Sequence, residues 1–193
     1  ILLDVLNEIE FKENEFKIIF DYCQKQKITF LCTPWDISSV NALEEYGIDG
    51  YKVASADLTN HDLIETIART GKPMILSTGM SNEREIIETV DLLKRLGAPY
   101  ILLNCNSTYP APFKDLNLRA MRTIKETFDI DVGYSDHSLR KEASIAAVAL
   151  GAKVIEKHFT LDRSLPGPDH KASLEPKEFQ DLIKSIRNIE LAL

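Results

Sequence analysis

Short apolar runs alternate along the chain with longer amphipathic segments. The runs lie at residues 28–33, 51–55, 73–78, 100–105, 131–135 and 153–158. Continuous apolar runs of this length are typical of strands that are buried on both faces of a parallel sheet. The pattern therefore predicts six parallel strands, each joined to the next by a helix.

Apolar stripes with the spacing of amphipathic helices separate these runs. Among them are the stripes at residues 16–23, 63–68, 86–93, 118–124 and 179–186. Pro176 stands where the last helix should begin, a position that proline favours. Glycines at positions 47, 71, 97 and 151 stand where helices should end. The chain therefore reads as a repeat of strand and helix without a linker or a break in composition.

Nearly every predicted strand ends in polar residues, and this distinguishes two α/β architectures. In a (β/α)₈ TIM barrel all these ends converge on one rim, whereas a doubly wound sheet concentrates them at one switch point. Neither a dinucleotide-binding glycine motif nor a Walker loop is present in the sequence. A complete barrel has about 250 residues. We therefore expect residues 1–193 to form a single domain, a partial TIM barrel with strands three to eight that lacks the first two strands.

Composition excludes several classes of function. The formal net charge of −7 argues against a nucleic-acid partner, because phosphate backbones are bound by clustered lysine and arginine. No apolar run approaches the ~20 residues of a membrane span, and no signal peptide is recognisable. The three cysteines are far apart and lack a metal-binding spacing. We expect a cytoplasmic protein with reduced thiols and no membrane association.

Two histidines form the strongest candidate for chemistry. His137 lies in the sequence SDHS at 135–138, and His158 lies in EKHFT at 156–160, each at the end of a predicted strand. Neutral imidazoles on adjacent strands can bind one metal ion and leave positions for water and substrate. We therefore predict that both are catalytic metal ligands. Asp136 and Glu156 either orient the imidazoles or are ordinary charged rim residues.

A lysine and several hydroxyl residues form a second candidate group. Lys52 lies inside an apolar strand, where an unpaired ammonium is costly, so it has either an anionic partner in the fold or an anionic substrate. Phosphate or carboxylate binding needs several donors from different loops together with a cation. The hydroxyl residues at the predicted rim are Thr33, Ser55, Ser77, Thr78, Ser107 and Ser135.

Several motifs resemble those of the sialic acid synthase family, which includes pseudaminic and legionaminic acid synthases. They are, in order, TP at 33–34, YKVASAD at 51–57, ILSTGM at 75–80, YPAP at 109–112, GYSDH at 133–137, EKHFT at 156–160, GPDH at 167–170 and SLEP at 173–176. The resemblance covers essentially the whole chain. It implies a barrel enzyme that condenses phosphoenolpyruvate with an N-acetylated amino sugar, N-acetylmannosamine or a relative. The products are a nonulosonic acid and phosphate, formed by metal-assisted C–O cleavage.

The resemblance also implies roles for single residues. His137 and His158 correspond to the ligands of a divalent metal, Mn²⁺ or Mg²⁺. The residues implied for phosphoenolpyruvate are Thr33, Lys52, Ser55, Ser77, Ser107 and Ser135, and those implied for the sugar are Asp57, Tyr109 and Asp169. Asp57 stands where many bacterial relatives have glutamate. The family further implies a homodimer and a carboxy-terminal antifreeze-like domain, which this sequence does not contain.

Two other functions compete with this reading. One is a Schiff-base class I aldolase on the same barrel, with Lys52 or Lys157 as the nucleophile. In that enzyme the paired histidines have no evident purpose. The other is a non-catalytic sugar-binding domain, which need not hold a metal ion.

Overall fold

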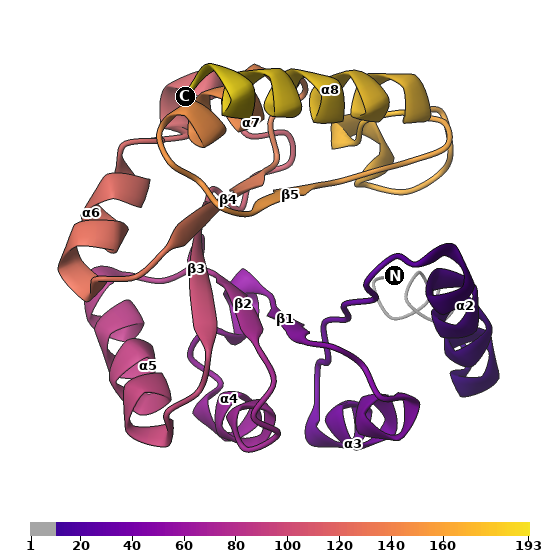
Figure 1. The fold of residues 1–193 in the computed structure, drawn as a ribbon, viewed down its shortest axis with the longest axis vertical. Coiled ribbons are helices and arrows are strands. Elements are labelled where there is room, and N and C mark those ends of the chain that lie inside the picture. Colours follow the sequence, from indigo (N-terminus) through magenta and orange to yellow (C-terminus); the bar gives the residue numbers. More distant parts are fainter. Residues whose placement is uncertain (1–10) are drawn as a thin grey trace.

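A parallel sheet forms the centre of the computed structural model, which describes residues 11–193. Its strands are β1 (Tyr51–Val53), β2 (Met74–Ser77), β3 (Tyr100–Cys105), β4 (Val132–Asp136) and β5 (Ile155–Lys157). They lie side by side in chain order, and each neighbouring pair is parallel. The sheet curves, with helices along its outer side, so that it forms a half-barrel (Figure 1). The prediction of an α/β fold in the form of a partial barrel is confirmed.

The helices begin and end at residues suited to those positions. They are α2 (Glu13–Gln26), α3 (Ile37–Tyr46), α4 (His61–Ala68), α5 (Glu83–Leu96), α6 (Ala120–Phe128), α7 (Glu142–Ala149) and α8 (Pro176–Ala192). Pro176 occupies the first turn of α8, and Gly97 ends α5 in the left-handed conformation that glycine adopts without strain. Among residues 11–193, no helix is both long enough and apolar enough to cross a membrane.

The run at 28–33 does not form the regular strand that its composition predicts. It makes a single parallel bridge, Cys32 to Tyr51, in which the Lys52 amide donates to the Cys32 carbonyl at 2.9 Å. Donors on a parallel strand alternate, so the next amide after Cys32 belongs to residue 34. Residue 34 is a proline, which has no N–H to donate. Pro34 therefore cannot extend the ladder beyond this bridge.

The hydrophobic core lies between the sheet and its helices. Leu76, Leu102 and Tyr134 project from the strands and are fully buried, as are Ile64 of α4 and Leu93 of α5. Because side chains alternate along a strand, the residues between these positions project to the concave side of the sheet. The half-barrel therefore has one face committed to packing and another available for chemistry.

Candidate active site

Strand alternation divides the side chains of β4 and β5 between two faces. The register pairs Ser135 with Glu156 and Asp136 with Lys157. The Ser135 hydroxyl donates to Glu156 Oε1 at 2.7 Å on the concave side. Asp136 faces the opposite way and contacts the hydroxyl of Ser144 in α7. The residues that follow, His137 and His158, therefore share the concave side with Ser135 and Glu156.

The two histidine rings meet at the rim of the half-barrel. Their centroids are 5.2 Å apart, and the ring planes are inclined by 76°. Tyr109 stacks on His137 with a centroid distance of 4.1 Å and lies edge-on to His158 at 5.2 Å. Burial raises the pKa of Tyr109 to about 12, so its hydroxyl stays protonated at neutral pH. Three strand-end loops thus place three rings in one cluster.

One hydrogen bond determines which nitrogen of His137 is free. Nδ1 lies 2.6 Å from the carbonyl oxygen of Asn106, which can only accept, so Nδ1 carries the proton. Burial lowers the pKa of His137 below its ordinary value, which favours the neutral ring. Nε2 therefore presents a lone pair, with the Ser135 hydroxyl 3.4 Å away. A neutral imidazole whose other nitrogen donates to a carbonyl is the usual form of a metal-bound histidine.

His158 has a carboxylate beside its ring. Its Nδ1 lies 3.8 Å from Oδ2 of Asp169, which is beyond hydrogen-bond distance, so this contact does not determine which ring nitrogen is free. Within residues 11–193, no group of three or more His, Cys, Asp or Glu side chains is arranged to hold a metal ion. The two imidazoles thus fit as two ligands of an ion whose other positions are filled by water, substrate or groups outside these residues.

The structure separates the two acidic residues considered as orienting groups. Glu156 faces the concave side and bonds to Ser135, whose hydroxyl in turn lies near His137. The Asp136 side chain is fully buried on the helix side, 3.2 Å from the ammonium of Lys157. Asp136 therefore has no direct contact with either imidazole. Of the two acids, only Glu156 lies on the concave side with the imidazoles, and its contact with them runs through Ser135.

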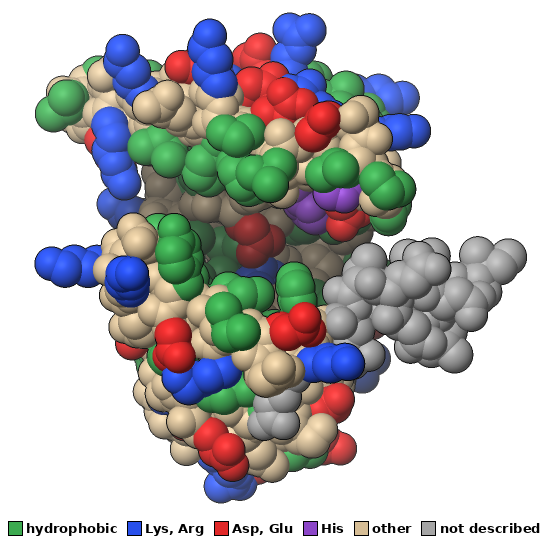
Figure 2. Space-filling model, turned by 90° about the vertical axis from the view of Figure 1, so that its right-hand side faces the viewer, with side chains coloured by type: hydrophobic (Ala, Val, Ile, Leu, Met, Phe, Trp, Pro, Cys, Tyr) green, Lys and Arg blue, Asp and Glu red, His purple; other side chains and the backbone are tan. Residues whose placement is uncertain are grey.

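Lys52 has a loosely placed anionic partner. Its ammonium is 3.7 Å from Oε2 of Glu156 and donates to the Val53 carbonyl at 2.6 Å. Burial lowers the pKa of Lys52, and the nearby Glu156 opposes that shift. Figure 2 shows acidic and basic side chains in the hollow between the two halves of the molecule, with histidine at its margin. The lysine ammonium can therefore bind a second anion from the open side.

The hydroxyl residues at the ends of β1, β2 and β3 surround a closely packed glycine. The Ser55 hydroxyl accepts a bond from the Gly79 amide at 3.1 Å. A β-carbon at Gly79 would lie 2.6 Å from the Ser107 hydroxyl oxygen, which leaves no space for a side chain. The Ser77 hydroxyl is buried, and it has no hydrogen-bond partner among the described residues. Such an orphan buried donor is expected where a ligand completes the site.

Two predicted substrate-binding residues stand outside this network. Thr33 follows the Cys32 bridge, and Asp57 lies in the 3₁₀ turn after β1 (Ser55–Asp57). Oδ1 of Asp57 accepts from Asn60, whereas Oδ2 is buried and has no partner among residues 11–193. Neither residue joins the ring contacts and hydrogen bonds that connect the histidines, Tyr109 and Glu156 in that part of the chain. Their roles remain predictions.

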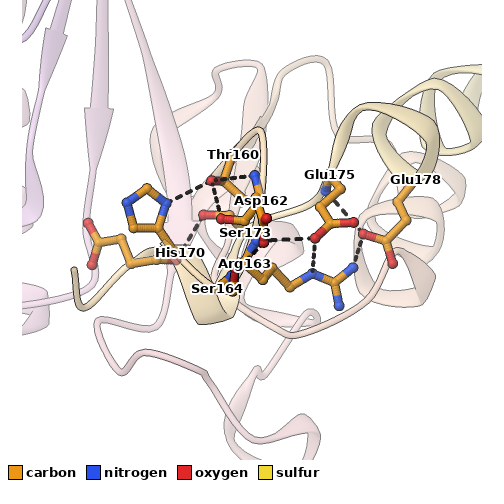
Figure 3. Close-up of polar contacts among 9 residues, drawn as sticks. Thr160, Asp162, Arg163, Ser164, His170, Ser173, Glu175 and Glu178 are labelled. Atoms are coloured by element: carbon orange, nitrogen blue, oxygen red, sulfur yellow. Dashed lines mark hydrogen bonds and ion pairs between the residues drawn. The ribbon is translucent and has the colours of Figure 1, made fainter. Parts of the chain in front are cut away.

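The loop after β5 is held by polar contacts at both ends. Thr160 Oγ1 lies 2.7 Å from Nδ1 of His170, and the guanidinium of Arg163 pairs with Glu175 and Glu178 at the start of α8 (Figure 3). This loop carries Asp169, the acid beside His158. Side chains thus tie this loop to the start of α8.

Some contributors to the site had no clear signal in the sequence. Asn106 orients His137 through its backbone carbonyl, a group that every residue possesses. Lys157 had a detectable signal, because a lysine within an apolar run needs an anionic partner. Its position relative to Asp136 could be found only once the register of β4 and β5 was known.

Three comparisons with known proteins cover nearly the whole chain. The profile of the NeuB family matches residues 1–193. An uncharacterized protein of Methanocaldococcus jannaschii is 47% identical over 98% of this chain and 57% of its own length. The N,N'-diacetyllegionaminic acid synthase of Campylobacter jejuni is 46% identical over 99% of this chain and 58% of its own length.

A solved structure shows the same arrangement. It is a crystal structure of the N-acetylneuraminic acid (sialic acid) synthetase from Leptospira borgpetersenii in complex with citrate. It matches this chain with a TM-score of 0.90 at 42% identity, over 93% of this chain and 63% of that one. The chain thus spans more than half, but less than two thirds, of the length of these relatives.

Proposed function

The chain belongs to the NeuB family of sialic acid synthase-like enzymes, and on that premise we propose that it forms much of the active site of a nonulosonate synthase. The substrates are phosphoenolpyruvate and an N-acetylated amino sugar, N-acetylmannosamine or a relative. The observation that carries this proposal is the cluster of His137, His158 and Tyr109 on the concave face, connected through Ser135 and Glu156 to Lys52.

His137 and His158 are assigned as ligands of a divalent metal ion. Imidazole nitrogen suits Mn²⁺ better than Mg²⁺, which prefers oxygen ligands and retains its water. When bound, such an ion polarises the aldehyde oxygen of the sugar. The protein orients the His137 ring through the Asn106 carbonyl at Nδ1, and the Asp169 carboxylate lies 3.8 Å from Nδ1 of His158.

Lys52 and the rim hydroxyls are assigned to phosphoenolpyruvate. The ammonium supplies charge, and its 3.7 Å separation from Glu156 leaves donors for a phosphate or carboxylate. The buried hydroxyl of Ser77, which has no partner within residues 11–193, supports a ligand at the same place. The remaining members of this set are Thr33, Ser55, Ser107 and Ser135.

The sugar is assigned to the outer part of the rim. Tyr109 offers a neutral hydroxyl and an aromatic face, both suited to carbohydrate. Asp169 has a half-exposed carboxylate that can accept hydrogen bonds from sugar hydroxyls. Asp57 has one buried carboxylate oxygen without a partner among the described residues, which supports its place in the same set.

In the proposed reaction the third carbon of phosphoenolpyruvate attacks the aldehyde carbon of the sugar. Water adds at the second carbon of phosphoenolpyruvate, and the C–O bond to phosphate then breaks. Phosphate therefore leaves with the original bridging oxygen. The test uses the full-length protein with phosphoenolpyruvate that carries ¹⁸O at the bridge, and mass analysis of the phosphate. Retained label supports the proposal, and phosphate without label overturns it.

One observation favours the aldolase as a second candidate. A Schiff-base nucleophile needs a lysine whose pKa is lowered, and burial lowers the pKa of Lys52. Lys157, the other lysine considered, has a side chain only 1% exposed on the helix side, so substrate cannot reach it. Treatment of the full-length protein with pyruvate and borohydride, followed by peptide mass analysis, separates the two functions. An adduct on Lys52 would establish the aldolase.

A non-catalytic sugar-binding domain and the oligomeric state need separate measurements. The synthase proposal predicts stoichiometric metal in the full-length protein, which a binding module does not require.

We also propose a homodimer for the full-length protein, and sedimentation equilibrium measures its mass. A monomer that retains synthase activity would overturn the dimer proposal alone.

A further inference from the structure

A buried ion pair lies directly behind the two histidines. Asp136 and Lys157 are register partners on β4 and β5, and they project to the helix side of the sheet. Oδ2 of Asp136 is 3.2 Å from the Lys157 ammonium, and the two side chains are 0% and 1% exposed. Each residue immediately precedes one of the histidines. The ion pair thus joins the two strands at the point where they present their rings.

The contacts of Lys157 extend to both sides of His137. Its ammonium pairs with Asp136 before the histidine, and it donates to the carbonyls of Ser138 and, at 3.1 Å, Arg140 after the histidine. All three ammonium protons therefore have acceptors. The single side chain that precedes His158 thus holds the backbone around His137.

Asp136 is equally well saturated. Its Oδ1 accepts from the Ser138 amide at 2.8 Å, and its Oδ2 accepts from the Ser144 hydroxyl of α7 at 2.5 Å. Helix α7 is the connection between β4 and β5. The carboxylate therefore fixes the end of β4, the turn after it and the connecting helix in one arrangement.

Stability alone is a weak explanation for this pair. Desolvation of two charges commonly offsets their attraction, and apolar residues of similar volume usually stabilise a fold as well. What a fully bonded buried pair supplies is a defined geometry, because each hydrogen bond restricts position and angle. Metal ligands need that restriction, since small displacements of a donor atom weaken coordination.

We propose that Asp136 and Lys157 are positioning residues that set the relative placement of His137 and His158 for one metal ion. This inference rests on the proposed metal role of the two histidines. It places the control of metal affinity on the face of the sheet that neither substrate reaches. Loss of the pair should weaken metal binding by about 10- to 100-fold, the range for groups that orient metal ligands.

The experiment titrates Mn²⁺ into the metal-free full-length protein and follows free Mn²⁺ by electron paramagnetic resonance. The variant Asp136→Asn/Lys157→Met removes both charges together and leaves no unpaired charge in the interior. The matched control is Glu44→Gln/Lys72→Met, which removes an ion pair of 2.7 Å at the opposite end of the sheet. Thermal unfolding identifies temperatures at which every variant is folded. We expect weaker Mn²⁺ binding in the first variant and unchanged binding in the control.

A milder variant covers the case in which the double variant does not fold. Ser144→Ala removes one hydrogen bond to Asp136 and should raise the Mn²⁺ dissociation constant several-fold. Unchanged Mn²⁺ binding in the folded double variant, or in Ser144→Ala where the double variant is unfolded, overturns the inference. Equal weakening in the control also overturns it, because the effect is then general. A wild-type protein that binds no Mn²⁺ overturns the proposed metal site and this inference with it.

Discussion

The two faces of β4 and β5 are built from alternate residues of the same strands, yet they differ in how completely their polar groups are paired. On the helix side, both carboxylate oxygens of Asp136 accept hydrogen bonds, and the Lys157 ammonium contacts Asp136 and two backbone carbonyls. On the concave side, Lys52 and Glu156 are 3.7 Å apart, and the only polar contact of Nε2 of His137 within residues 11–193 is the Ser135 hydroxyl at 3.4 Å.

This difference indicates where the protein retains binding capacity. A polar group that is saturated within the fold can only hold structure, whereas an incompletely paired group can exchange its partner for a ligand. The buried Ser77 hydroxyl, which lacks a partner among the described residues, belongs to the second kind. The comparison predicts that substitutions on the concave face impair binding directly, and that those on the helix face impair stability and affect metal binding only through the placement of the histidines.

The largest effect is expected from His137→Ala. The variant removes a proposed metal ligand, so the full-length protein should lose stoichiometric metal and its synthase activity. Elemental analysis after dialysis measures the metal. The control is His61→Ala, because His61 lies 3.3 Å from Thr89 and belongs to α4 rather than to the rim. Metal retained in the His137 variant would contradict the assignment of this face.

The next effect is a loss of stability from Lys157→Met alone. This variant leaves Asp136 buried with an uncompensated charge, which typically costs about 3–5 kcal/mol in the free energy of unfolding. The matched variant Lys72→Met breaks a pair whose side chains are 26% and 35% exposed, which typically costs about 0–1 kcal/mol. Urea unfolding measures both. Equal losses in the free energy of unfolding would show that burial does not make the Asp136–Lys157 pair more important for stability than the Glu44–Lys72 pair.

Much of the fold could be predicted from periodicity. Apolar runs located β1 to β5, and helical stripes located the helices that connect them, because burial on both faces leaves a clear pattern. The run at 28–33 shows the limit of this reasoning, because an apolar composition does not ensure that a run pairs with its neighbour along its whole length. That residues 1–193 form one domain without its first two strands stays a prediction.

The site was less accessible from the sequence. The pairing of His137 with His158 followed from their places at successive strand ends. That Asp136 and Glu156 lie on opposite faces of the sheet could not be predicted, because it depends on the register of β4 and β5. The contact of Tyr109 with both histidine rings depends on the path of a loop, which local spacing does not determine.

A smaller effect is expected from Lys52→Met on the concave face. Removal of the ammonium should raise the KM for phosphoenolpyruvate by about 10- to 100-fold, or about 1.4–2.7 kcal/mol of binding free energy. The free energy of unfolding should change by less than in Lys157→Met, because Glu156 is 37% exposed and can be solvated. Steady-state kinetics and urea unfolding measure the two effects. A larger loss of stability than of affinity would assign Lys52 to structure.

The smallest effect is a pH dependence of stability that comes from the concave lysine, Lys52. Burial lowers the pKa of Lys52 below the ordinary lysine value of 10.5. Between the lowered pKa and 10.5 the unfolded chain binds more protons than the folded one, so the free energy of unfolding rises with pH. The slope from one group is at most about 1.4 kcal/mol per pH unit, and it ends above 10.5. The free energy of unfolding of the wild type minus that of Lys52→Met isolates this contribution, because the titration of the groups that both proteins share cancels in the difference. Phosphate bound at Lys52 should favour the ammonium and flatten the slope. Urea unfolding from pH 8 to 11, with and without inorganic phosphate, measures both, and a difference that falls with rising pH would contradict the assignment.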